Sequence, residues 1–216
     1  MIKKIYIQNG GLDSKSPIGF VTLGATSGVL STKVDNETTL LDFKYEIGQW
    51  VSDEGGIICA RWIENSRQHY LVVDTDNLAV STRWSGITTI IGASAQSLYN
   101  GLSNSIAIIG QVGHTQSAAK LCLDSTRNGQ SDWYLPSSQE FEIMTNNLFH
   151  VSQGIEDAGG VSFDLRDRPY YWTSTELDTR AFIYRVDNSL GTVATKTVST
   201  LSSLAISVRA FRKFII

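Results

Sequence analysis

Residues 131–141 read SDWYLPSSQEF, and this stretch decides how the chain around it folds. Pro136 has no backbone N–H to donate, and its ring biases Leu135 towards an extended backbone. The next residues, Ser137 and Glu140, have the spacing of a capping box, in which a hydroxyl and a carboxylate satisfy free amides at a helix start. The stretch therefore predicts a sharp corner that leads into a helix.

The residues beyond this corner have helical periodicity. Phe141, Met144 and Leu148 recur on one face, which predicts a short amphipathic helix over 138–149. We expect Asp132 to accept hydrogen bonds from backbone amides before the corner. The corner residues to which we assign structural roles are Trp133, Pro136, Ser137 and Glu140.

The composition is that of a folded protein and argues against nucleic-acid binding. A chain of 216 residues that is 42% hydrophobic has enough apolar material for a sizeable core. Its net charge of −3 gives no overall basic field, so we expect no nucleic-acid partner. Residues 207–214, SVRAFRKF, contain Arg209, Arg212 and Lys213 in a strand-like alternation, which favours a solvated face over a phosphate site.

No apolar stretch reaches the roughly 18 residues that a membrane helix needs, and the N-terminus lacks the apolar run of a secretory signal. We therefore expect synthesis in the cytosol and no membrane insertion.

Cys59 and Cys122 lie among apolar residues, which favours buried free thiols over a disulfide. The three histidines share no ligand-like spacing, so we expect no zinc site and no cofactor.

The N-terminal 50 residues are rich in Thr, Ser and Gly and carry strand-like runs at 3–8, 18–24 and 38–47. A segment of this size hardly sustains its own core, so it packs onto the rest of the chain or onto a partner. We therefore divide the chain into a β-rich attachment segment, 1–50, and a domain, 51–216.

Within the larger domain, residues 54–62 and 69–76 predict a β-hairpin. Residues 103–126 have apolar side chains at helical spacing and predict two short helices, with Gly113 as the break.

Strands dominate the end of the chain. We predict them at 170–176, 180–187 and 205–214, and we interpret 150–169 and 177–204 as polar loops inserted between fixed blocks. Helices that come early and strands that gather late predict an α+β fold.

Four blocks in a fixed order carry a family resemblance: GGII (55–58), SDWYLPSSQEF (131–141), YYWTSTE (170–176) and SVRAFRKF (207–214). They resemble the Legionella collagen-like protein C-terminal domain family, which is allied with the Fibrobacter major paralogous domain. The resemblance implies a C-type-lectin-like fold for the larger domain. Members of this fold serve as glycan binders, adhesins, phage receptor-binding proteins and structural virion parts, and a distant branch contains formylglycine-generating enzymes.

The resemblance also bears on sites. The Glu-Pro-Asn and Gln-Pro-Asp motifs of calcium-dependent sugar binding do not occur in the sequence. Asp74 and Asp76 offer oxygen ligands, but the reading we favour for them is a turn. Formylglycine chemistry needs a reactive cysteine pair, whereas the two cysteines here have apolar neighbours.

We expect no catalytic residues. The carboxylates Asp132, Glu140 and Glu176 have structural roles that explain them, and no nucleophile-elbow pattern accompanies a histidine. Trp133 and Trp172 are expected in the core rather than in a sugar-stacking platform. Glu176 and Arg209 are expected to form an ion pair that joins the late strands.

Loops on a rigid scaffold are where recognition residues usually lie. The candidate ligand-binding residues in the later loops are Asp178, Arg180, Tyr184, Arg185, Asp187 and Asn188.

These observations lead to a functional hypothesis. We expect a non-enzymatic structural or adhesin-type component of a bacteriophage particle (head or tail decoration, fibre or receptor-binding) that displays a lectin-like domain. It is made in the host cytoplasm, carried on the virion, attached to other virion proteins through residues 1–50 and present as a homo-oligomer or multi-copy assembly. A host surface glycan is a further candidate partner. The alternative is a glycan-binding or adhesin domain of the bacterial cell surface.

Overall fold

The chain forms two compact units, Met1–Lys44 and Tyr45–Ile216. The computed structural model describes residues 4–8, 17–23, 30–34, 37–41, 43–163, 169–186, 192–201 and 204–216, with the backbone alone for the strands up to residue 41. The boundary between the units lies six residues before the end of the expected attachment segment.

The first unit contains a four-stranded antiparallel sheet in which consecutive strands are neighbours. Its strands are β1 (Lys4–Gln8), β2 (Pro17–Leu23), β3 (Leu30–Val34) and β4 (Glu37–Leu41). The expected strand at 38–47 is therefore too long, because the chain passes into the second unit at Tyr45.

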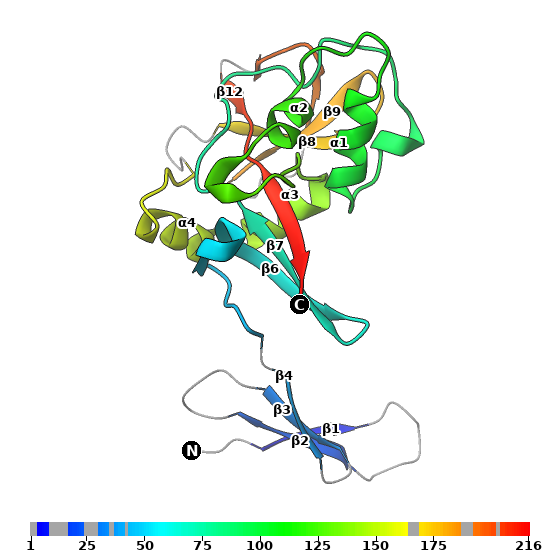
Figure 1. The fold of residues 1–216 in the computed structure, drawn as a ribbon. Helices are drawn as coiled ribbons and strands as arrows, with labels where there is room; N and C mark the ends of the chain where they lie inside the picture. The colour runs from blue at the N-terminus through cyan, green and yellow to red at the C-terminus, as the bar shows by residue number, and fades with distance from the viewer. Residues whose placement is uncertain are drawn as a thin grey trace. The chain divides into compact units, whose positions relative to one another are not determined.

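The second unit has one sheet in the order β13-β7-β6-β5. Its strands are β5 (Trp50–Val51), β6 (Gly56–Glu64), β7 (Arg67–Val73) and β13 (Phe211–Ile215). The expected hairpin is confirmed, since β6 and β7 pair antiparallel around Asn65 and Ser66, which both have positive φ. The last strand, β13, returns to pair with β7 (Figure 1).

A second sheet of this unit has the order β10-β9-β8-β12-β11. Its strands are β8 (Tyr170–Glu176), β9 (Arg180–Arg185), β10 (Thr192–Thr195), β11 (Thr200–Leu201) and β12 (Leu204–Ser207). The central strand β8 is buried on both faces from Tyr171 onwards. Two predictions are wrong here: the region read as loop after β9 contains β10 and β11, and the single strand expected at 205–214 is divided between β12 and β13 of different sheets.

The described part of the chain has four α-helices: α1 (Gly101–Ile109), α2 (Ala118–Leu123), α3 (Ser138–Asn146) and α4 (Leu148–Asp157). The two predicted helices with a break at Gly113 are confirmed, and this glycine has a φ of +79°. The mixed α+β class is therefore confirmed.

The helix expected over 138–149 ends at Asn146, and α4 occupies much of the region predicted as loop 150–169. Val151 and Ile155 of α4 are fully buried, and the helix packs against β6 (Figure 1). Gly154 also permits α4 to approach Gly48, because a Cβ at residue 154 would collide with the Gly48 carbonyl oxygen. The signal that the prediction missed is the apolar pair at i and i+4.

Aliphatic and aromatic side chains from both sheets, α3 and α4 meet in one core. Its fully buried members include Ile57, Cys59, Val73, Phe141, Met144, Val151, Ile155 and Phe211. Cys59 and Cys122 are both free and buried, as predicted. Burial raises the pKa of each thiol well above its ordinary value. Within the described ranges, no helix combines the length and apolar character needed to span a bilayer.

Candidate functional site

The predicted corner, residues 131–141, forms hydrogen bonds to both sheets of the second unit. The backbones of Tyr134 and Phe211 exchange two hydrogen bonds of 2.8 and 2.9 Å, and Ser174 N donates to Pro136 O at 2.7 Å. This places the corner between β13 and β8. The predicted capping box of Ser137 and Glu140 is present at the start of α3.

Glu140 is the centre of a buried polar cluster. One carboxylate oxygen accepts from the backbone amides of Ser137, at 2.8 Å, and Gly101, at 3.1 Å. The other accepts from the Tyr134 hydroxyl at 3.1 Å and pairs with Lys213 Nζ at 2.5 Å. The carboxylate therefore links the starts of α1 and α3 to the last strand.

Trp133 and Trp172 are fully buried, as expected for core residues. Each indole N–H has a carbonyl acceptor, on Arg127 at 3.1 Å and on Thr82 at 2.8 Å, respectively. Neither ring is available as a surface platform for a sugar.

The predicted ion pair between Glu176 and Arg209 is wrong. Glu176 pairs with Lys196 Nζ at 2.5 Å, and both side chains are fully buried. The carboxylate also accepts from the backbone amides of Ile91 and Gly92, at 2.8–3.1 Å. The reason is the chain path, because Lys196 follows β10 in the sheet that contains Glu176.

Arg209 and Arg212 do not form the solvated face that the sequence predicted. Arg209 is 1% exposed, and its guanidinium donates to Asn77, to Asp74 O and Thr75 O, and to Val161 O, and lies 4.3 Å from the Phe163 ring centroid. Burial lowers its pKa from the ordinary value.

Arg212 binds both oxygens of Asp132, at 2.6 and 3.0 Å, and Glu54 Oε2 at 2.7 Å. The predicted backbone-capping role of Asp132 is therefore replaced by a bidentate ion pair. The segment does not alternate as one strand because residues 208–210 pass between the two sheets, and this turns Arg209 inwards.

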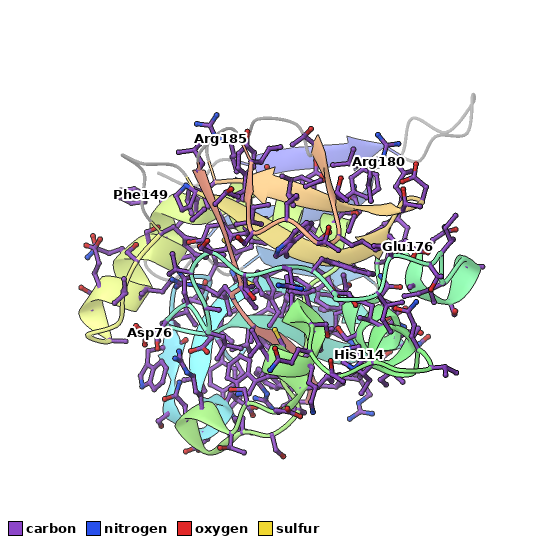
Figure 2. All side chains as sticks on the ribbon, turned by 90° about the horizontal axis from the view of Figure 1, so that it is seen from above. Asp76, His114, Phe149, Glu176, Arg180 and Arg185 are labelled. Atoms are coloured by element: carbon purple, nitrogen blue, oxygen red, sulfur yellow. The ribbon has the colours of Figure 1, made fainter. Side chains whose placement is uncertain are left out.

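The predicted ligand-binding residues do not form a single site. Asp178 and Arg180 pair at the turn between β8 and β9, where the hydrogen bond from Arg180 lowers the pKa of Asp178 to about 2. Arg185 lies at the far end of β9, where its guanidinium is 5.7 Å from the Tyr170 ring centroid. The five residue steps from Arg180 to Arg185 span about 16 Å of strand, and Figure 2 shows the two arginines well apart. Tyr184 is half-buried against the core.

Asp187 and Asn188 lie outside the described residues.

The site that the structure does form is a groove beside the hairpin of β6 and β7, which we name the Trp62 groove. Its volume is about 290 Å³, and its lining is mostly apolar. The lining residues are Ala60, Arg61, Trp62, Leu71, Tyr99, Gln139, Glu140, Ile143 and Lys213.

Two aromatic residues, Trp62 and Tyr99, line this groove. Trp62 is stacked on His69, with ring centroids 5.3 Å apart and planes inclined by 23°, which fixes the orientation of its indole. Tyr99 is 67% exposed, and Lys213 Nζ donates to its carbonyl oxygen at 3.2 Å. Trp62 and Tyr99 therefore line the groove together with Gln139 and Lys213, whose polar groups also bond within the chain, to Glu142 at 2.8 Å and to Glu140.

Sequence reasoning did not identify this groove. Trp62 and Tyr99 are 37 residues apart, and Tyr99 and Gln139 are 40 residues apart. Only the pairing of β6, β7 and β13 with the corner brings them together. The one available signal was Trp62 near the end of a hairpin strand, where a large aromatic ring has less core to enter.

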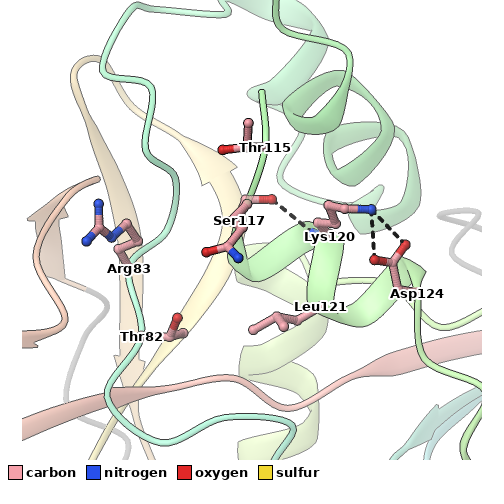
Figure 3. Close-up of a pocket in the computed structure, with 8 residues that line it drawn as sticks. Thr82, Arg83, Thr115, Ser117, Lys120, Leu121 and Asp124 are labelled. Carbon is pink, nitrogen blue, oxygen red and sulfur yellow. Dashed lines mark hydrogen bonds and ion pairs between the residues drawn. The ribbon is translucent and has the colours of Figure 1, made fainter. Parts of the chain in front are cut away.

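A second hollow, also of about 290 Å³, lies beside α2 and is lined mainly by polar residues (Figure 3). Lys120 at this hollow already pairs with Asp124 at 2.8 Å, four residues along the same helix. The charges of Lys120 and Asp124 therefore have a structural explanation.

Among the described residues, no group of three or more His, Cys, Asp or Glu side chains is arranged to hold a metal ion. Asp74 and Asp76 form a turn, in which Asp76 N donates to Asp74 Oδ1 at 3.3 Å. Burial raises the pKa of Asp74, although the nearby Arg127 acts in the opposite direction.

No model of a protein family matches the chain, and none of the curated proteins matches it at a significant level.

Proposed function

We propose that this protein is a non-enzymatic recognition protein that binds a host-surface glycan through a C-type-lectin-like domain. In this proposal the domain is displayed by a bacteriophage particle as an adhesin-type component, and the first unit, residues 1–44 of the expected segment 1–50, attaches it to other virion proteins. The observation that carries the binding function is the Trp62 groove.

The groove suits the chemistry of a sugar ring. A pyranose has an apolar C–H face that packs on aromatic rings, and hydroxyl edges that need hydrogen-bond partners. Trp62 and Tyr99 provide the aromatic surfaces, while Gln139 and Lys213 provide polar groups at the same groove. A volume of about 290 Å³ is at the lower end for ligand sites, which favours one sugar unit of a longer glycan.

The lectin-like part of the proposal is supported by how the family-like blocks meet. The first block begins β6, which pairs with β7, and β7 pairs with β13 of the last block. The corner block bonds to β13 through Tyr134 and to β8 through Pro136. Residues that carry the resemblance are therefore neighbours in one structural centre.

Intrinsic fluorescence offers a direct test. Trp84, Trp133 and Trp172 are fully buried, so a bound sugar at the groove perturbs mainly Trp62. We expect a panel of methyl glycosides or a glycan array to reveal a ligand whose binding is lost in Trp62→Ala and reduced in Tyr99→Ala.

Two control variants make this test specific. Trp50→Ala removes another exposed indole, 38% exposed and outside the groove lining, and should bind as the unmodified chain does. Arg180→Ala tests the site that the sequence predicted on β9. Binding that is lost in Arg180→Ala but kept in Trp62→Ala would move the function to β9 and reject the groove.

Location is a separate part of the proposal, and the bacterial cell surface is the alternative. The genes adjacent to this one distinguish the two. Capsid, portal or tail genes support the particle, whereas surface-export genes favour the bacterial adhesin.

A further inference from the structure

Helix α1 faces the interior with its smaller and more polar residues. Its buried residues are Gly101, Asn104, Ser105 and Ile108. Asn104 is fully buried, where its amide donates to Ser97 O and to Ser174 Oγ. A surface helix of a globular protein usually has the opposite arrangement, with its large apolar residues facing the core.

The large aliphatic residues of α1 lie on its outer side. Leu102, Ile106 and Ile109 are 42%, 55% and 37% exposed, and their spacing of four and three residues aligns them in a ridge along the helix. Solvent exposure of such a ridge is unfavourable, at roughly 25 cal/mol for each Å² of apolar surface that could be buried.

A row of small residues runs beside this ridge. Ser103, Ala107 and Gly110 follow the same spacing of four and three, one position further along the chain. Ala107 and Gly110 border a shallow hollow of about 530 Å³, which also includes Ile90 and Val112. Ile90 is 57% exposed and Val112 is 99% exposed, so the hollow is partly apolar.

This surface belongs to a long uncharged part of the sequence. Residues 84–119 contain no Asp, Glu, Lys or Arg, and their titratable side chains are those of Tyr99 and His114, in a chain that is 18% charged. Solvated surfaces usually carry charge, whereas the cores of protein–protein interfaces are depleted in it. The ridge, the small-residue row and the hollow therefore have the composition of an interface.

We propose that this face of α1 binds the same face of a second copy of this chain. The ridge and the hollow lie side by side on one helix, so a two-fold axis places the ridge of each copy in the hollow of the other. The small residues allow the two helices to approach closely. The ridge and the hollow carry no charged side chains from residues 84–119, so contact between two copies brings no like charges of this segment together. A charged partner would find no opposite charges on this segment.

The first test is sedimentation equilibrium of the full chain over a series of concentrations. The substitution Ile106→Glu puts a charge in the middle of the ridge, and Phe149→Glu is the matched control on α4, at a 77% exposed position. Figure 2 shows Phe149 on the opposite side of the view from His114 of the uncharged segment. We expect a dimer whose dissociation constant rises more than about 30-fold in Ile106→Glu and is unchanged in Phe149→Glu.

The second test locates the contact. When Ile106→Cys and Ala107→Cys chains are mixed, mild oxidation should produce a disulfide-linked dimer of one chain of each kind, since the proposed contact places the ridge of one copy against the small-residue row of the other. The native thiols are buried and do not compete. Phe149→Cys should give no such product.

Each outcome is decisive. A chain that remains monomeric throughout the series overturns the proposal. So does a chain that associates equally in Ile106→Glu, because its contact then lies elsewhere, as in residues 1–50. The proposal is independent of the Trp62 groove, and sugar binding by the monomeric variant would leave the proposed function intact.

Discussion

Glu140 shows how much of this fold depends on single polar residues. Its buried carboxylate accepts from Ser137, Gly101 and Tyr134 and pairs with Lys213. Gly101 has to be glycine here, since a Cβ would lie 2.5 Å from Glu140 Oε2 and 2.6 Å from Leu135 O. A buried charge is tolerated only when its acceptor capacity is used in this way.

At this scale the capping box gives a testable prediction. In Ser137→Ala, the side-chain half of the box is lost, together with the hydroxyl that donates to Glu140 at 3.0 Å. We expect the free energy of unfolding to fall by about 1 kcal/mol, measured by denaturant titration. Ser131→Ala, at an exposed position, is the control and should change stability by less than about 0.5 kcal/mol. Equal effects of the two substitutions would contradict the capping role.

Between elements, the fully buried pair of Glu176 and Lys196 joins β8 to the residue after β10. It also fixes the segment before α1, because Lys196 Nζ donates to Thr89 O at 2.9 Å and Glu176 accepts from Ile91 N and Gly92 N. Lys196 Nζ lies 5.0 Å from the Trp84 ring centroid, which adds a cation–π contact. The backbone of the uncharged segment 84–119 is therefore bonded to this buried ion pair at Thr89, Ile91 and Gly92.

Removal of one member of this pair leaves a buried charge without its partner. We expect Lys196→Met to lower the free energy of unfolding by about 3–5 kcal/mol. The double variant Glu176→Gln with Lys196→Met removes both charges and should recover much of that loss. Denaturant unfolding of the three chains measures the difference. A double variant as unstable as the single one would show that packing, rather than charge, accounts for the loss.

For the whole molecule, the boundary between the units matters most. Gly48 N donates to Ile58 O at 2.8 Å, Ile58 N donates to Gln49 O at 3.0 Å, and β5 pairs with β6. Tyr45 also contacts Tyr70 and Phe214 edge-to-face. Residues 45–51 therefore belong to the second unit, although the sequence assigned most of them to the attachment segment.

This boundary predicts how shortened chains behave. A chain of residues 45–216 should fold by itself and melt cooperatively, since it keeps every contact of its core. A chain that starts at Ser52 loses β5 and its bonds to β6 and should melt at a lower temperature. Calorimetry of both chains measures this. If the shorter chain melts at the same temperature, residues 45–51 contribute nothing to the unit.

The sequence by itself determined the features that depend on near neighbours. The capping box, the break at Gly113, the hairpin of β6 and β7 and the two buried thiols are confirmed, because turn geometry, helix caps and local hydrophobicity act over a few residues. The resemblance to a lectin-like family comes from four such local blocks and stays a prediction.

Only the tertiary structure decided which distant side chains meet. The partner of Glu176 is Lys196, Arg209 turns inwards, and Trp62, Tyr99 and Gln139 surround one groove. These contacts depend on sheet order and register, and on the passage of the chain between two sheets at residues 208–210. A period-2 pattern describes a single continuous strand, so it assigned the wrong face to Arg209 at the point where one strand ends and the next has yet to begin.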